Sequence, residues 1–79
     1  MWVKTFDGKN LINARSFHVS RNIGGKSGEK YAIQALSSAA GMQGGYVCGF
    51  YPDEERADAE LEKIIAAIEA GEKVYRFAK

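Results

Sequence analysis

The sequence predicts an α+β fold, in which an antiparallel meander of about four strands precedes one amphipathic C-terminal helix and a short final strand. Three observations predict it. Residues 1–51 alternate apolar and polar side chains in short stretches that glycine-rich segments separate, which is typical of strands and turns. From residue 53 the apolar spacing becomes helical. Because the chain has only 79 residues, a single domain over residues 1–79 is expected.

The first two strands are predicted from residues 2–6 and from a segment that begins near Leu11. Residues 2–6 alternate between the two faces of a strand. Asp7 and Gly8 follow, and this dipeptide favours a tight hairpin turn in which both residues adopt positive φ. In the second strand the parity of the apolar residues changes near Arg15, which predicts a β-bulge there.

Two long loops separate the next strands. Residues 22–29 and 37–45 are rich in glycine and small side chains, which predicts loops rather than regular structure. Residues 31–36 resume an extended pattern, and residues 46–51 have strong strand propensity. Long glycine-rich loops are entropically costly in so short a chain, which favours a function for them.

The helix is predicted over residues 53–70, and residues 74–77 form the short final strand. Asp53 can accept hydrogen bonds from the free N–H groups of the first turn, and Gly71 can supply a left-handed cap at the end. The apolar stripe that should face the sheet consists of Ala57, Leu61, Ile64, Ile65 and Ile68.

One helix covers one face of a sheet, and the aromatic residues exceed what it can cover. They are Trp2, Phe6, Phe17, Tyr31, Tyr46, Phe50, Tyr51, Tyr75 and Phe77. The remainder is expected at a subunit interface, which predicts a homo-oligomer. A partner subunit would also supplement the modest core of so small a domain.

Cysteine and histidine usage narrows the classes of site. Cys48 is the only cysteine and His18 the only histidine, so an intrachain disulfide is excluded and a Cys/His zinc site lacks ligands. No metal or cofactor is expected. No apolar run approaches the roughly 20 residues of a membrane span, and residues 1–9 do not resemble a signal peptide, so a cytoplasmic location is expected.

The formal net charge of +1 is the sum of a basic N-terminal part and an acidic C-terminal part of the chain. Residues 1–51 carry six basic and two acidic side chains, whereas residues 52–79 carry five basic and eight acidic ones. This asymmetry favours subunit contacts or an anionic ligand at the basic end. The alternative is that acidic side chains crowd one solvated face of the helix.

The first candidate site is the glycine-rich loop around Lys26. Gly25-Lys26-Ser27 matches the end of a phosphate-binding P-loop, but Ser20 stands where that pattern requires glycine and a strand follows where it requires a helix. A nucleotide hydrolase is therefore not expected. Backbone N–H groups of such a loop can still bind an anion, with Arg21, Lys26 and Lys30 adding charge. The alternative is a solvated hairpin loop.

The second candidate is the segment 42–46. Gly44 and Gly45 would let a ligand approach the backbone, Gln43 offers an amide, and Tyr46 could stack on a base or ring. The alternative is a flexible loop. The predicted ligand-binding residues are Arg21, Lys26, Gln43, Gly44, Gly45 and Tyr46.

Catalysis is not expected. His18 and Cys48 each lie within a predicted strand, and no third catalytic group is predictable from the sequence. The dense carboxylates occupy solvated helix positions, where ordinary pKa values are expected. The basic residues are too few to predict a nucleic-acid interface.

The opening residues 2–8 and 11–13, together with the helix that Asp53 begins and Gly71 ends, resemble small bacterial and phage proteins with a strand meander followed by one helix. The predicted oligomerisation and glycine-rich loops are also similar in design to phage anti-defence sponges, which sequester cyclic-nucleotide or ADP-ribose signals without cleaving them. The resemblance implies a non-enzymatic homo-oligomer that sequesters an anionic, nucleotide-like signalling molecule in the host cytoplasm. The alternative is a phage or bacterial interaction module or inhibitor that docks on a host protein.

Overall fold

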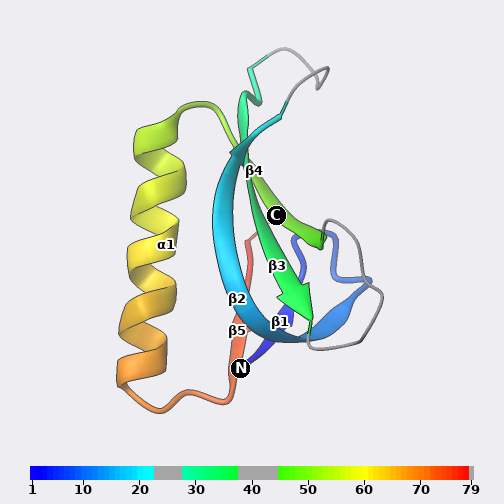
Figure 1. The fold of residues 1–79 in the computed structure, drawn as a ribbon, viewed down its shortest axis with the longest axis vertical. Helices are drawn as coiled ribbons and strands as arrows, with labels where there is room; N and C mark the ends of the chain where they lie inside the picture. The colour runs from blue at the N-terminus through cyan, green and yellow to red at the C-terminus, as the bar shows by residue number, and fades with distance from the viewer. Residues whose placement is uncertain (23–27, 38–44, 79) are drawn as a thin grey trace.

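The computed structural model describes residues 1–22, 28–37 and 45–78 (Figure 1). The elements are β1 (Trp2–Lys4), β2 (Leu11–Arg21), β3 (Tyr31–Ser37), β4 (Tyr46–Tyr51), α1 (Glu54–Glu69) and β5 (Val74–Arg76). The fold is α+β, as predicted, and the five strands form one sheet in the order β4-β3-β2-β1-β5. Three strand pairs are antiparallel, but β5 runs parallel to β1, so the sheet is mixed.

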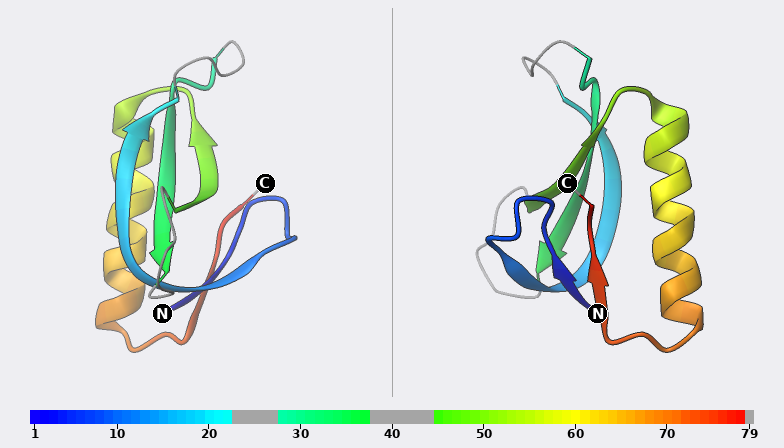
Figure 2. Two further views of the ribbon diagram at one scale, coloured as in Figure 1. Left: turned by 45° about the vertical axis from the view of Figure 1, so that its right-hand side comes forward. Right: turned by 180° about the vertical axis from the view of Figure 1, so that it is seen from behind.

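A bulge bends β2 and curls the sheet. The register between β2 and β3 shifts between Ala14 and Ser16, so the predicted break near Arg15 is confirmed. Residues 11–13 of β2 pair with β1, whereas Ala14 and residues 16–21 pair with β3. Figures 1 and 2 show β2 as a long curved strand. The curl brings the segment after β1 to β4, where the N–H of Phe6 donates to the carbonyl of Cys48 at 2.8 Å.

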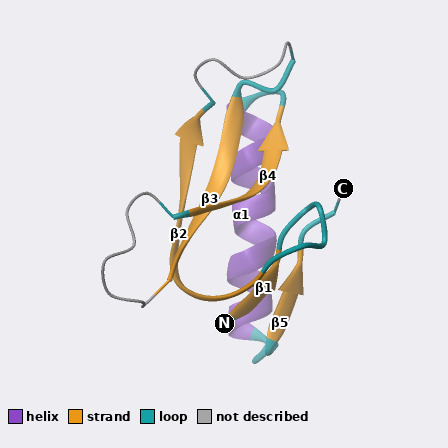
Figure 3. Cartoon of the chain, turned by 90° about the vertical axis from the view of Figure 1, so that its right-hand side faces the viewer, coloured by secondary structure: helices purple, strands orange, loops and turns teal. Residues whose placement is uncertain are grey.

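The helix α1 packs across β2, β3 and β4, which lie side by side in front of it in Figure 3. Asp53 has extended backbone angles, and its side chain accepts a hydrogen bond from the N–H of Arg56 at 2.8 Å. Gly71, with φ of +78°, turns the chain toward β5. Both ends of the helix therefore form as the sequence predicts.

The core lies between α1 and the sheet. Its buried members are Val3, Ile12, Ala14, Ile33, Ala35, Cys48, Ala57, Ile64 and Phe77. Full burial of a side chain such as Ile33 or Ile64 stabilises the fold by about 1.5–3 kcal/mol. No helix in the described part of the chain is long and apolar enough to cross a membrane.

The aromatic residues are better covered than expected. Phe6 meets Phe50 edge to face with 5.2 Å between ring centres, and Tyr75 meets Phe77 in the same way at 5.2 Å. Among the nine aromatic residues only Trp2 and Tyr46 are exposed. The other seven are partly or fully buried, in part because the curl of β2 folds the β1–β2 turn over β4. The expectation that a subunit interface covers the remaining aromatic surface stays a prediction.

The apolar stripe of α1 also differs from the expected one. Ala57 and Ile64 are buried and Leu61 is half-buried, but Ile65 and Ile68 are 42% and 53% exposed. Figure 1 shows β2 curving away from the last turns of α1, where β5 runs beside the helix instead. The sequence pattern therefore identifies Ala57, Leu61 and Ile64 as covered positions, but it does not predict the exposure of Ile65 and Ile68.

The turn between β1 and β2 is not the two-residue turn that the sequence predicts. Gly8 has φ of +71°, but no non-glycine residue in the described ranges has positive φ. The N–H of Thr5 donates to the carbonyl of Asn10 at 3.0 Å, which leaves a wider connection over residues 6–9. The carboxylate of Asp7 accepts hydrogen bonds from the Thr5 hydroxyl at 2.7 Å and from the Lys9 N–H at 3.1 Å. Asp7 thus stabilises the turn through its side chain.

Candidate anion-binding site

The structure separates the predicted site residues that it describes. Lys26, Gln43 and Gly44 lie outside the described residues. Arg21 ends β2, where its guanidinium lies 5.9 Å from the ring centre of Tyr31. Tyr46 begins β4 opposite Ala35. Tyr31 and Ala35 are about 13 Å apart along β3, so Arg21 and Tyr46 do not meet.

Gly45 has a structural reason to be glycine. Its φ is +81°, and a Cβ at this position would lie 2.7 Å from the carbonyl oxygen of Ala35 and 2.7 Å from Cδ2 of Leu36. Any side chain here would clash with β3. The glycine therefore permits close packing of β4 on β3, whatever a ligand does nearby.

A different set of basic side chains meets on the outward face of β1, β2 and β5. The register places Lys4 between Leu11 of β2 and Arg76 of β5. Val3, the neighbour of Lys4 in the chain, is fully buried in the core. Because side chains alternate along a strand, Lys4 projects away from the core.

A second row of side chains lies beside the first on the same face. Trp2 is placed between Asn13 of β2 and Val74 of β5. Figure 2 shows β1 and β5 side by side, as the hydrogen bond from the N–H of Trp2 to the carbonyl of Lys73 at 3.1 Å requires. Trp2 is 43% exposed, which is unusual for so large an apolar ring.

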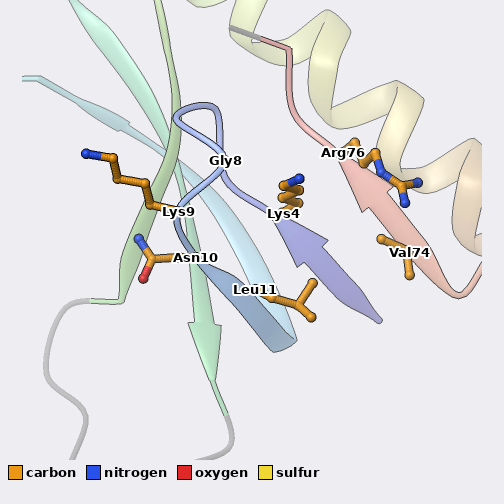
Figure 4. Close-up of a pocket in the computed structure, with 7 residues that line it drawn as sticks. All are labelled: Lys4, Gly8, Lys9, Asn10, Leu11, Val74 and Arg76. Atoms are coloured by element: carbon orange, nitrogen blue, oxygen red, sulfur yellow. The ribbon is translucent and has the colours of Figure 1, made fainter.

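An open depression of about 340 Å³ lies over this face. Its lining consists of Lys4, Leu11, Val74 and Arg76 from the strands and Gly8, Lys9 and Asn10 from the turn. Figure 4 shows Leu11 and Val74 beside Lys4 and Arg76, while Lys9 and Asn10 extend from the turn on the other side. The volume lies at the small end of the range for small-molecule sites.

The lining of the depression is cationic. Lys4, Lys9 and Arg76 contribute positive charge, and no lining residue is acidic. The nearby carboxylate of Asp7 is used by the turn, and its hydrogen bonds, chiefly that from Thr5, lower the pKa of Asp7 below its usual value. Within residues 1–22, 28–37 and 45–78, neither Lys4 nor Arg76 forms an ion pair with a carboxylate.

Lys4 and Arg76 stand directly opposite each other on neighbouring strands. Like charges at such cross-strand positions destabilise a sheet. Two like charges brought close together here would oppose the pairing of β1 with β5. An anion between the two side chains would replace their repulsion with two attractive, charge-assisted contacts.

His18 and Cys48 do not form a nucleophile–base pair. Cys48 is fully buried in the core, where burial raises the pKa of its thiol to about 11. His18 is exposed and pairs with Gln34 on the opposite face of the sheet. A thiolate is therefore not available at neutral pH, and no imidazole lies beside the thiol to generate one.

A half-buried polar cluster lies where α1 meets β4 and β5. The hydroxyl of Tyr75 donates a hydrogen bond to Oε2 of Glu60. Burial, together with this bond, raises the pKa of Tyr75, and burial with the charge of Glu60 raises the pKa of Tyr51. Both tyrosines remain protonated at neutral pH, and the hydroxyl of Tyr75 ties β5 to α1 through Glu60. No three His, Cys, Asp or Glu side chains gather as metal ligands in the described part of the chain.

No family model, curated protein or solved structure matches the chain. Sequence reasoning counted Lys4 among the basic residues but did not place it in a site, because Lys4 and Arg76 lie near opposite ends of the chain. Only the parallel pairing of β1 with β5 brings them together, and no local pattern predicts that pairing.

Proposed function

We propose that the protein binds a small anionic ligand, without transforming it, on the outward face of β1, β2 and β5. The observation that carries the proposal is the placement of Lys4 opposite Arg76, without carboxylate partners in the described chain, beside an open depression. A face built for stability alone would place opposite charges at these positions. Leu11 and Val74 supply apolar contacts for the uncharged part of the ligand.

The proposal includes the biological setting that the sequence suggests. The ligand is a nucleotide-like signalling molecule of the cytoplasm, and the protein sequesters it as a homo-oligomer. The exposed Ile65 and Ile68 of α1 support self-association, since two large aliphatic side chains in solvent favour a contact between copies. Light scattering tests the oligomer independently of the ligand, and a monomer at about 100 μM would remove that part of the proposal while leaving the binding face.

Calorimetry with inorganic pyrophosphate at low ionic strength tests the binding face. The wild-type chain should bind, and Lys4→Gln and Arg76→Gln should each weaken binding by about 10- to 150-fold, which is the range for one charge-assisted contact. Lys63→Gln on α1 is the matched control and should bind as the wild type does. Equal affinity in the wild type and in the Lys4→Gln/Arg76→Gln double variant would contradict the proposal, as would no binding by the wild type.

A free strand edge favours a second candidate, an interaction module that docks on an acidic partner protein. Residues 16–21 of β2 pair with β3 on one side, but β1 ends before the bulge, and no described backbone group pairs with their other side. Such an edge accepts an added strand. The exposed Arg15, His18 and Arg21 favour an acidic one.

Hydrogen exchange tests this second candidate. An acidic strand-forming peptide should slow amide exchange in residues 16–21, and a peptide with lysine in place of each acid should not. Unchanged exchange with both peptides would exclude docking of such a segment at this edge. The anion-binding face would be unaffected, because Lys4 and Arg76 lie on other strands.

A further inference from the structure

We propose that the ligand of this face is a nucleotide, with its phosphate between Lys4 and Arg76 and its base stacked on Trp2. The inference rests on the proposed anion-binding function and adds a second contact to it. It names the chemical class of the ligand, a nucleoside phosphate, and the residue that distinguishes this class from other anions.

The position of Trp2 carries the inference. Trp2 and Lys4 project from the same face of β1, two residues apart, which sets their Cα atoms about 6.6 Å apart. Val74, which pairs with Trp2 in the register of β1 and β5, lines the depression, so Trp2 stands one residue row beyond the lining on the same face. A phosphate and an aromatic ring joined by one sugar can therefore contact both side chains at once.

The exposure of Trp2 has no explanation in the fold itself. Phe6 meets Phe50 and Tyr75 meets Phe77, whereas no ring contact is found for Trp2 among the described residues. Trp2 is 43% exposed and shares one face of the sheet with the cations Lys4 and Arg76. An indole face is a good stacking platform for a base, and Arg76 can hold a phosphate through two parallel hydrogen bonds.

The same arrangement predicts little base selectivity. Stacking accepts any base, because each has a π face. Within the described residues around the depression, only the exposed amides of Asn10 and Asn13 could read the polar edge of a base. Purines should bind somewhat better than pyrimidines because they stack over a larger area.

The small number of cations favours a mononucleotide over a nucleic-acid strand. The face presents three cationic side chains, Lys4, Lys9 and Arg76, and Lys9 extends away from the other two in Figure 4. A strand of nucleic acid needs a basic track along several phosphates. Two adjacent cations suffice for one phosphate group.

Trp2 is the only tryptophan, so its fluorescence reports directly on the proposed contact. Titration with AMP should quench this fluorescence, whereas ribose 5-phosphate should bind with little quenching. Calorimetry should give AMP an affinity about 5- to 150-fold higher than that of ribose 5-phosphate, the range for one base stacked on an aromatic side chain.

Substitution of the indole separates the two contacts. In Trp2→Ala, AMP should lose its advantage and bind as weakly as ribose 5-phosphate does, while the affinity for ribose 5-phosphate stays unchanged. Trp2→Phe should restore part of the advantage. Lys63→Gln changes an exposed side chain on α1 and serves as the control, which should bind AMP as the wild type does. Circular dichroism confirms that each variant is folded.

Other binding results would each overturn one or both of the two proposals, stacking on Trp2 and anion binding by Lys4 and Arg76. Equal affinities for AMP and ribose 5-phosphate in the wild type would overturn the stacking inference and leave anion binding intact. No binding of ribose 5-phosphate, AMP or pyrophosphate would overturn both. An affinity for a ten-residue oligothymidine more than 100-fold above that for AMP would assign the face to single-stranded nucleic acid instead.

Discussion

Replacing Lys4 with glutamate should stabilise the fold while it removes anion binding. Lys4 faces Arg76 across neighbouring strands, which lie about 4.8 Å apart, and the long side chains can spread their charges to about 7 Å. In water two unit charges at about 7 Å repel by roughly 0.6 kcal/mol. Lys4→Glu turns this repulsion into a similar attraction, so the electrostatic change is about 1.2 kcal/mol.

The measured gain should be about 0.5–1 kcal/mol, because exposed cross-strand pairs rarely deliver their full Coulomb energy. A gain of this size raises Tm by about 2–8 °C in a domain of this length. Urea unfolding, followed by circular dichroism, gives the free energy directly. Lys4→Gln should show about half the gain, and Lys63→Glu on α1 controls for the change in net charge.

Ionic strength supplies the decisive comparison. At about 1 M salt the screening length falls to roughly 3 Å, so the gain of Lys4→Glu should nearly vanish. If Lys4→Glu is no more stable than the wild type at low salt, Lys4 and Arg76 do not repel each other in the free protein. A gain that persists at high salt would show that the substitution acts through something other than charge.

Three further predictions concern the framework of the site. Gly45→Ala should lower the free energy of unfolding by more than the roughly 1 kcal/mol expected for Gly71→Ala, since both glycines have positive φ but only the Cβ at Gly45 would meet other atoms. Urea unfolding of both variants measures the difference. Equal losses of stability would show that the Cβ at Gly45 does not clash. Cys48 should react with a thiol reagent at pH 8 only when the chain unfolds, because burial raises its pKa to about 11; labelling as fast as that of an unfolded control would contradict its burial. The lowered pKa of Asp7 stabilises the fold at pH values above the unfolded-state pKa near 3.8, and this stabilisation is lost as the pH falls through the lower folded-state pKa. Asp7→Asn should therefore be less stable than the wild type near pH 6 and approach its stability near pH 2, which acid titrations of stability measure. Equal stability of the two proteins at both pH values would refute the role of this carboxylate.

The parts of the fold that depend on neighbouring residues could be predicted from the sequence. Asp53 and Gly71 begin and end α1 because a cap needs only the local backbone and one suitable residue. The bulge after Ala14 could be predicted from the parity of apolar residues along one strand. Alternation also placed Val3 on the face opposite Trp2 and Lys4.

The remaining features depend on contacts between distant segments. The extent of the curl in β2 decides that Ile65 and Ile68 stay exposed, and no property of α1 itself reports that curl. The parallel pairing of β5 with β1 brings Arg76 to Lys4, although a short strand after a helix is compatible with other positions in the sheet. The sequence therefore pointed to glycine-rich loops, whose chemistry is visible locally, and the part played by Lys26 there stays a prediction.

The pairing of β1 with β5 limits when the sheet can finish folding. The N–H of Trp2 donates to the carbonyl of Lys73, and the N–H of Phe77 donates to the carbonyl of Lys4. During synthesis β1 therefore lacks one of its neighbouring strands until β5 has been made. Contacts of such long sequence separation slow folding, because a long loop must close before they form. A ligand bound to both Lys4 and Arg76 would connect β1 with β5, and it should slow the local opening of β5 that hydrogen exchange detects.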